Sequence, residues 1–178
     1  MHYLKRYIIS FSGLKEGWHE FEFCAGDRFF GNFEGTEIKR ARLNVTVTLN
    51  RKPNFLELFF QLKGTVQIPC DRCLDDMEWP MDHTRKIMVK FADQEVEEEE
   101  SIVFLLRGET EINVAQYIYE FAHLALPLKR VHPNDENGES LCNHDMLRKL
   151  ASLTPSSEKH PAANQWAGLK EWMRKNYS

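Results

Sequence analysis

The sequence predicts an α+β fold, with a largely antiparallel sheet or partial barrel in the first two-thirds of the chain and helices packed at the C-terminal end. Two observations predict this class. Apolar and polar residues alternate with a period of two up to about residue 106, which is typical of strands that bury one face. After Asn113 the apolar residues recur at intervals of three and four, which indicates helix. The length of 178 residues suits one sizeable domain, to which we assign residues 1–153.

The clearest strand covers residues 43–50, where every second residue from Leu43 is apolar and shares one face. The turn 51–54 leads into an apolar run over 55–68, and the two runs together predict a long antiparallel hairpin. The second strand of this hairpin ends in a turn that carries two cysteines.

Shorter strands are expected on both sides of this hairpin. Residues 7–11 and 18–23 are expected to pair as another hairpin, residues 84–91 alternate again, and residues 102–106 form a short apolar strand. Between the last two, residues 93–100 carry six carboxylates, which predicts a solvated loop.

Two helices are expected after the strands. Asn113 is a plausible cap for a helix that runs to about Leu126, where Pro127 ends it. A second, short helix is expected after Asn143, with Met146, Leu147 and Leu150 on one side.

The C-terminal part has a different composition. Residues 154–163 are rich in turn-forming residues and are predicted to be a flexible linker. A terminal amphipathic helix is predicted over residues 164–178, with Asn164 as its cap. Its apolar stripe predicts docking on the sheet or on a partner. The residues expected to bind a partner are Trp166, Leu169 and Trp172.

Composition sets the environment of the chain. The longest apolar runs are far below the roughly 20 residues that cross a bilayer, and the N-terminus has no apolar segment of signal-peptide length, so we expect a cytoplasmic chain with no membrane span.

The formal charge is −4, but the loop 93–100 alone contributes −6, which leaves about +2 elsewhere. A phosphate-facing surface is therefore permitted, although most basic pairs in proteins are merely solvated. The candidate RNA-binding residues are Lys39, Arg40, Arg42, Arg85, Lys86, Lys129 and Arg130.

The C-x-x-C turn of Cys70 and Cys73 is the strongest chemical signal. Its spacing can place both thiolates about 2.3 Å from a zinc ion, and a tetrahedral site would be completed by two more ligands. His132 and Cys142 could supply them, although H-x9-C is not a standard zinc-finger interval. Two alternatives stay open: metal-free turn thiols, and redox chemistry, which the acidic residues after the turn disfavour. The fourth cysteine, Cys24, fits an alternating strand and is expected to be a half-buried free thiol.

Catalytic motifs are absent from the sequence. It contains no G-x-S-x-G elbow, P-loop, G-x-G-x-x-G or H-E-x-x-H. We therefore expect no enzymatic activity and no small-molecule substrate, and an enzyme with an unusual site stays open as the alternative.

The order of these features resembles that of a known family. The chain reads G-x-V-x-I-x-C-x-R-C over residues 64–73, followed by an acidic loop, Leu-Ala-Leu-Pro over 124–127, Val131-His132, Cys142, and Asn-Gln-Trp-Ala-Gly-Leu over 164–169. This combination is similar to that of the YceD family of large ribosomal RNA subunit accumulation proteins.

The resemblance implies a cytoplasmic, non-enzymatic factor required for the accumulation, processing or assembly of large-subunit ribosomal RNA. Its partners would be the RNA precursor or ribosomal proteins. By position, Cys70 and Cys73 match the family's C-x-x-C, and His132 and Cys142 match its downstream ligand pair. The alternative function is a zinc-containing adaptor that binds another protein through the terminal helix and does not contact RNA.

Overall fold

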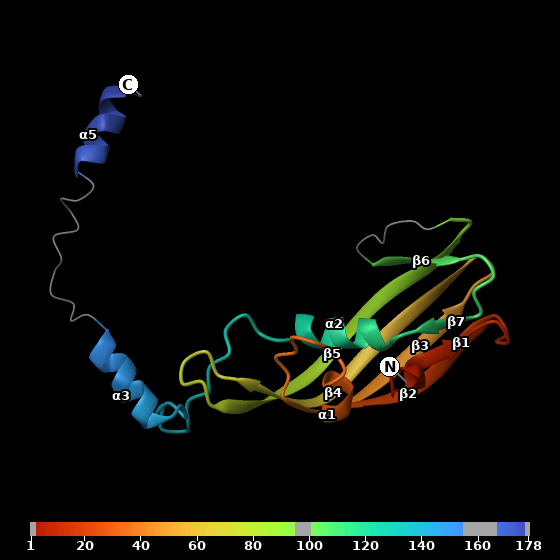
Figure 1. Cartoon of the computed structure of the whole chain (residues 1–178), viewed down its shortest axis with the longest axis horizontal. Coiled ribbons are helices and arrows are strands. Elements are labelled where there is room, and N and C mark those ends of the chain that lie inside the picture. The colour runs from red at the N-terminus through yellow and green to blue at the C-terminus, as the bar shows by residue number, and fades with distance from the viewer. Residues whose placement is uncertain (1–2, 95–100, 155–166, 177–178) are drawn as a thin grey trace.

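The main element of the molecule is a five-stranded sheet (Figure 1). The computed structural model describes residues 3–94, 101–154 and 167–176. The strands are β2 (Gly17–Gly26), β3 (Arg40–Arg51), β4 (Phe55–Pro69), β5 (Asp76–Ala92) and β6 (Ile102–Leu106). They lie in sequence order, and all neighbours are antiparallel except β5 and β6, which are parallel. With helices mostly later in the chain, the predicted α+β class is confirmed.

A second, two-stranded sheet corrects one prediction. After the 3-10 helix η1 (Tyr3–Tyr7), β1 (Ile8–Ser10) pairs with β7 (Glu111–Asn113), while β2 pairs with β3. The expected hairpin of residues 7–11 and 18–23 is therefore wrong. Alternation tells which face a strand buries but not which strand it pairs with. Here Ile9 is buried in the core, and Phe11 donates its backbone N–H to the carbonyl of Thr110, so this segment is held beside β7 instead of beside β2.

The strand β5 begins eight residues earlier than predicted. Its first part contains Pro80, and a proline in the sequence argues against a central strand. A proline is tolerated in a sheet where its missing N–H would face away from the ladder. Since β6 pairs only with residues 88–92, β5 is an edge strand at Pro80. The early part of β5 is thereby free to run with β4 to the cysteine turn.

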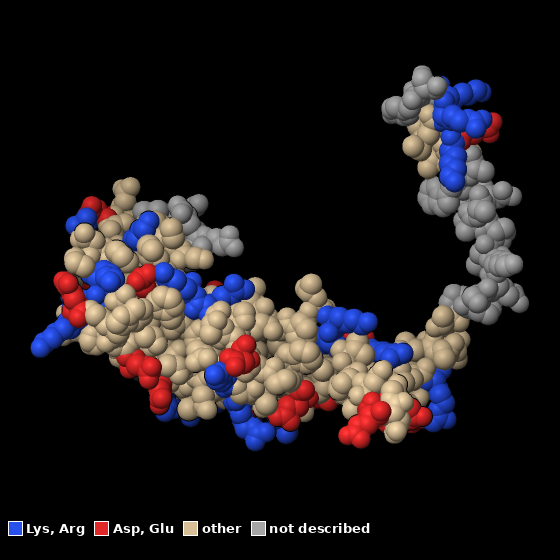
Figure 2. Space-filling model, turned by 180° about the vertical axis from the view of Figure 1, so that it is seen from behind, with Lys and Arg blue, Asp and Glu red and all other residues tan. Residues whose placement is uncertain are grey.

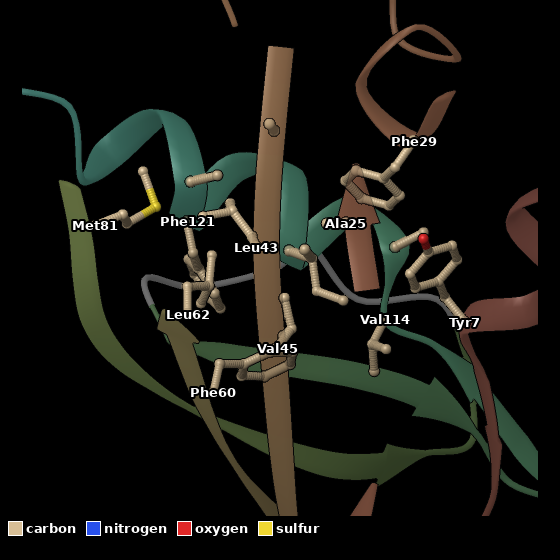
Figure 3. Packing of buried hydrophobic residues seen from close by; sticks show 14 of the residues in the cluster. Tyr7, Ala25, Phe29, Leu43, Val45, Phe60, Leu62, Met81, Val114 and Phe121 are labelled. Atoms are coloured by element: carbon tan, nitrogen blue, oxygen red, sulfur yellow. The ribbon is translucent and has the colours of Figure 1, made fainter. Parts of the chain in front are cut away.

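One face of the sheet carries the core. The predicted apolar face of β3 is confirmed, and the matching residues of β4 are equally buried. This face is covered by α1 (Asp27–Phe30), by the small sheet and by α2 (Ala115–Leu124) (Figures 1 and 3). In Figure 3, Phe121 of α2 points toward Phe60 and Leu62, and the Phe121 and Phe60 rings lie 5.1 Å apart at a steep angle. Burying each such side chain contributes about 1.5–3 kcal/mol, so this contact fixes α2 on the sheet.

The predicted cap of α3 (His144–Leu153) is present, whereas α2 begins one residue later than predicted, with Val114 in the cap position and no side-chain cap hydrogen bond from it. The Asn113 side chain accepts a hydrogen bond from the Ala115 N–H at 2.9 Å. The α3 helix begins after Asn143, whose side chain accepts from the N–H groups of Asp145 and Met146. These bonds satisfy backbone donors that have no partner within the helix.

The terminal helix α5 (Ala167–Asn176) lies within the predicted range. Its side chains Leu169, Trp172 and Met173 are about half exposed. The predicted cap Asn164 and Trp166 lie outside the described residues, as do the linker from residue 155 onward and positions 95–100 of the acidic run. Among the helices that the structure describes, none is long and apolar enough to cross a membrane.

Candidate metal centre

The site begins where β4 and β5 extend past α2 and are joined by the C-x-x-C turn (Figure 1). The Cys70 N–H donates to the Asp75 carbonyl and the Leu74 N–H donates to the Cys70 carbonyl, both at 2.9 Å. Leu74 has a positive φ of 65°, which reverses the chain after the second cysteine. The Arg72 N–H points at the Cys70 sulfur at 3.4 Å. The turn therefore folds around the Cys70 sulfur.

The segment after α2 is tied to this turn by two hydrogen bonds. The Asp71 N–H donates to the Arg130 carbonyl at 2.6 Å, and the Arg130 N–H donates to the Asp71 carboxylate at 2.8 Å. This reciprocal pair brings the following residues alongside the turn. As a result His132 Nδ1 lies 3.4 Å from the Cys73 sulfur.

The nine residues between His132 and Cys142 leave the site and return to it as a small hairpin. Asn134 and Ser140 form a β-bridge, and the Leu141 N–H donates to the Pro133 carbonyl at 3.2 Å. The Asp135 carboxylate closes the tip by accepting two backbone N–H groups. The unusual interval is therefore compatible with a shared site, and the Cys142 sulfur lies 3.8 Å from that of Cys70.

The distances fit a tetrahedral ion. With Zn–S bonds of about 2.3 Å and Zn–N bonds of about 2.0 Å, tetrahedral angles require S···S separations of about 3.8 Å and S···N separations of about 3.5 Å. The sulfurs of Cys70 and Cys142 lie 3.8 Å apart and the Cys73 sulfur lies 3.4 Å from His132 Nδ1, which match these values, and all four ligand atoms lie within 4.8 Å of one another. The three cysteines are buried and the histidine is half-buried. The predicted set of four is thus brought together and could hold a metal ion.

The surroundings also favour a thiolate at one position. Burial raises the pKa of the Cys70 thiol, but the N–H groups of Cys73, Arg72 and His132 counter it and lower this pKa to about 6. Burial is the main cause of the raised pKa of Cys73. Cys24 lies outside the cluster and is exposed, not half-buried as expected.

The comparison with known families gives one match. The family model described as large ribosomal RNA subunit accumulation protein YceD matches residues 58–171, which include all four candidate ligands. The chain belongs to the YceD family. Membership links this YceD protein to the accumulation of large-subunit ribosomal RNA. The searches of curated proteins and of solved structures found no match.

The basic residues predicted to bind RNA are not gathered on one surface of this YceD protein. Strand register places Arg40, Arg42 and Lys86 on the face of the sheet opposite the core, whereas Arg85 is on the core-side face. Four of the seven residues form ion pairs with carboxylates. These pairs are Lys39–Asp76 (2.7 Å), Arg42–Glu78 (3.6 Å), Lys86–Glu57 (2.5 Å) and Arg130–Glu37 (2.6 Å). Figure 2 likewise shows basic and acidic side chains interspersed, without one broad basic field.

Sequence reasoning missed the residues that position the ligands. Besides Asp71, the Asn143 side chain donates to the Asp75 carboxylate at 3.0 Å and so ties the start of α3 to the cysteine turn. Periodicity carries no signal for such bonds. The one available hint was an Asp inside the C-x-x-C turn, because Asp commonly accepts backbone N–H groups in turns.

Arg130 is expected to be a structural residue, and replacing it by Ala should lower the free energy of unfolding by about 1 kcal/mol. Only 19% of its side chain is exposed, and its hydrogen bond to Glu37 lowers the pKa of that carboxyl below the ordinary 4.5. A carboxyl whose folded pKa is lowered contributes stability above its unfolded pKa, and this is lost as the pH falls through the folded value. The difference between R130A and wild type should therefore shrink in acid, which urea unfolding at neutral and acidic pH would measure.

Lys129, the neighbour of Arg130, provides the matched control for the unfolding experiment. Lys129 is exposed, and within the described part of the chain it has no ion-pair partner. K129A should leave stability unchanged. Equal losses in the two variants would contradict the structural role of Arg130.

Proposed function

We propose that this YceD protein is a non-enzymatic factor that associates with precursors of the large ribosomal subunit and is required for the processing or assembly of their RNA. The observation that carries the proposal is the family match over residues 58–171, which encloses the whole candidate metal centre. This function places the protein in the cytoplasm, with the RNA precursor or ribosomal proteins as partners.

The ion is proposed to be zinc with a structural role. Three thiolates and one imidazole are a donor set that zinc prefers, and thiolates disfavour magnesium and calcium. Protein side chains would fill all four positions, whereas a catalytic zinc keeps one position for water or substrate. A closed site of this kind leaves no position for a substrate, so the ion itself would have a structural role.

Depleting the protein from cells is expected to reduce large-subunit RNA relative to small-subunit RNA and to cause precursors to accumulate. Re-expression of the full chain should restore the ratio. In a sucrose gradient the protein should sediment with large-subunit precursors and return to the top after RNase treatment. An unchanged RNA ratio in depleted cells would overturn the proposal.

A second candidate is a zinc-containing adaptor that binds another protein and does not contact RNA. Exposed leucines near the metal centre favour it. Leu74 directly follows Cys73 and is 67% exposed, and Leu141 directly precedes Cys142 and is 56% exposed. Leu128, four residues before His132, is fully exposed. A complex that survives RNase and contains no RNA would support this function instead.

A further inference from the structure

A cavity of about 630 Å³ lies at the end of the sheet opposite the metal centre. Four segments converge on it. They are residues 11–12 just after β1, the β3–β4 turn with its flanking strand residues at 51–56, the end of β5 at 90–91 and the β6–β7 loop at 107–109. Its volume is within the range of about 300–1,000 Å³ that is typical of small-molecule and cofactor sites.

The floor of this cavity is apolar and aromatic. Phe11 and Leu56 are buried beneath it, and Phe91 is half-buried with its ring 5.8 Å from that of Phe11. Phe55 is half-buried and lies directly opposite Lys90 in the β4–β5 register. In the strand register Phe55 and Lys90 lie on the face of the sheet opposite the core, whereas Phe91 lies on the core face with Leu56. Phe55 is therefore the ring that shares a side of the cavity with Lys90.

The polar part of the lining is cationic. It contains four basic residues and a single carboxylate, that of Glu109, although the chain as a whole is acidic. Arg51 donates to the backbone carbonyls of Ser12 and Leu14, and Arg107 is paired with Asp93 at 2.8 Å. Lys52 and Lys90 are exposed, and neither has an ion-pair partner among the residues described. Two cations thus remain available to an anion at this cavity.

We propose that this cavity binds one nucleotide of single-stranded RNA, with a phosphate against Lys52 and Lys90 and the base against Phe55. Aromatic rings beside cations are how proteins bind unpaired nucleotides, because each base has a face that can stack and each phosphate has a charge. In a duplex the bases are stacked on one another, so a paired strand does not fit. This site rests on the proposed function and identifies where the RNA would be held.

The test uses the full chain and a fluorescent 12-nucleotide single-stranded RNA, whose binding is followed by anisotropy at several salt concentrations. Removing both cations in K52A/K90A should weaken binding by about tenfold and lower the slope of log affinity against log salt by about 1.4, since each phosphate contact on a single strand contributes about 0.7. The control K63A/K149A removes the same charge elsewhere. Lys63 is eight residues along β4 from Phe55, a distance of roughly 27 Å. The control should bind like wild type.

A third variant, F55A, separates the base from the phosphate. It should weaken binding by about tenfold through lost stacking and leave the salt slope unchanged. All variants should retain the thermal unfolding midpoint of the wild type, because the replaced side chains are exposed or half-buried at the rim.

Three results would overturn the site. If wild type binds the RNA and K52A/K90A binds equally well, the cavity is not where RNA binds, and the proposed function stands. If a 12-base-pair duplex competes as well as the single strand, the ligand is not unpaired RNA. If wild type does not bind the RNA even at low salt, the site is wrong, and the gradient experiment decides the proposed function independently.

Discussion

Removing the metal is expected to destabilise the end of the molecule formed by the cysteine turn and residues 128–143. We expect about one zinc per chain in protein purified without added metal or chelator. An ion present at about 1,000 times its dissociation constant stabilises the folded state by roughly 4 kcal/mol. For a chain of this size that corresponds to a melting temperature about 10 °C higher. Elemental analysis and thermal unfolding with and without chelator measure both quantities.

Removing the metal should have this effect because few other contacts hold the cysteine turn and residues 128–143 together. Beyond the reach of α2, the described buried residues that link the turn to the later chain are the cysteines themselves, and Val131, Met146 and Leu147 are only partly buried. The remaining links are a few hydrogen bonds, each of which contributes only about 1 kcal/mol. Without the ion, the hairpin between His132 and Cys142 should lose its hydrogen-exchange protection first.

Single substitutions provide the matched comparison. C73S should reproduce the effect of chelator, whereas C24S removes an exposed thiol outside the cluster and should change neither zinc content nor stability. A zinc-free protein whose melting temperature ignores chelators would contradict the metal centre.

The candidate site was predictable from the sequence because of the turn chemistry on both sides of it. Cys70 and Cys73 directly follow a strand whose apolar residues are clearly patterned. The pattern therefore predicts that both cysteines lie in the turn at the end of that strand. Whether Cys142 could reach Cys70 and Cys73 depended on the path of the loop between His132 and Cys142. Its Asp135 and Gly138 are turn-forming residues, and Gly138 has a φ of +84°, but no spacing rule states that such a turn returns the chain to its starting point.

The fold was predictable where burial follows local pattern. The alternation of β3 and the helical period of α2 both reflect one buried face, which the structure confirms. Pairing partners do not follow from local pattern, because they depend on the whole chain. The pairing of β1 with β7 and the parallel pairing of β6 with β5 could not be predicted for this reason. Each of these strands lies beside a strand to which no short turn connects it. The RNA surface also could not be predicted, because sequence shows cations but not the carboxylates opposite them on neighbouring strands.

Replacing Gly64 by Ala is expected to lower the free energy of unfolding by at least about 4 kcal/mol. Gly64 lies within β4 opposite Leu43 and Met81 and has a φ of +147°, a conformation that costs other residues about 1–3 kcal/mol. An added Cβ would also overlap the carbonyl oxygen of Arg42, a backbone atom that cannot move without displacing β3. Strain and overlap therefore add.

Two other glycines separate these causes in urea unfolding. Gly108 has a φ of +103° but nothing within 4 Å of an added Cβ, so G108A should show the conformational cost alone, about 1–3 kcal/mol. Gly13 has neither feature, and G13A should stay within about 1 kcal/mol of wild type. A G64A loss no larger than that of G108A would mean that β3 and β4 can separate without penalty at this point. Gly64 lies on β4 only six residues before Cys70, which directly follows the end of that strand. A displaced β4 should therefore also weaken metal binding, so G64A protein that still folds is expected to lose its zinc to a competing chelator sooner than G108A does.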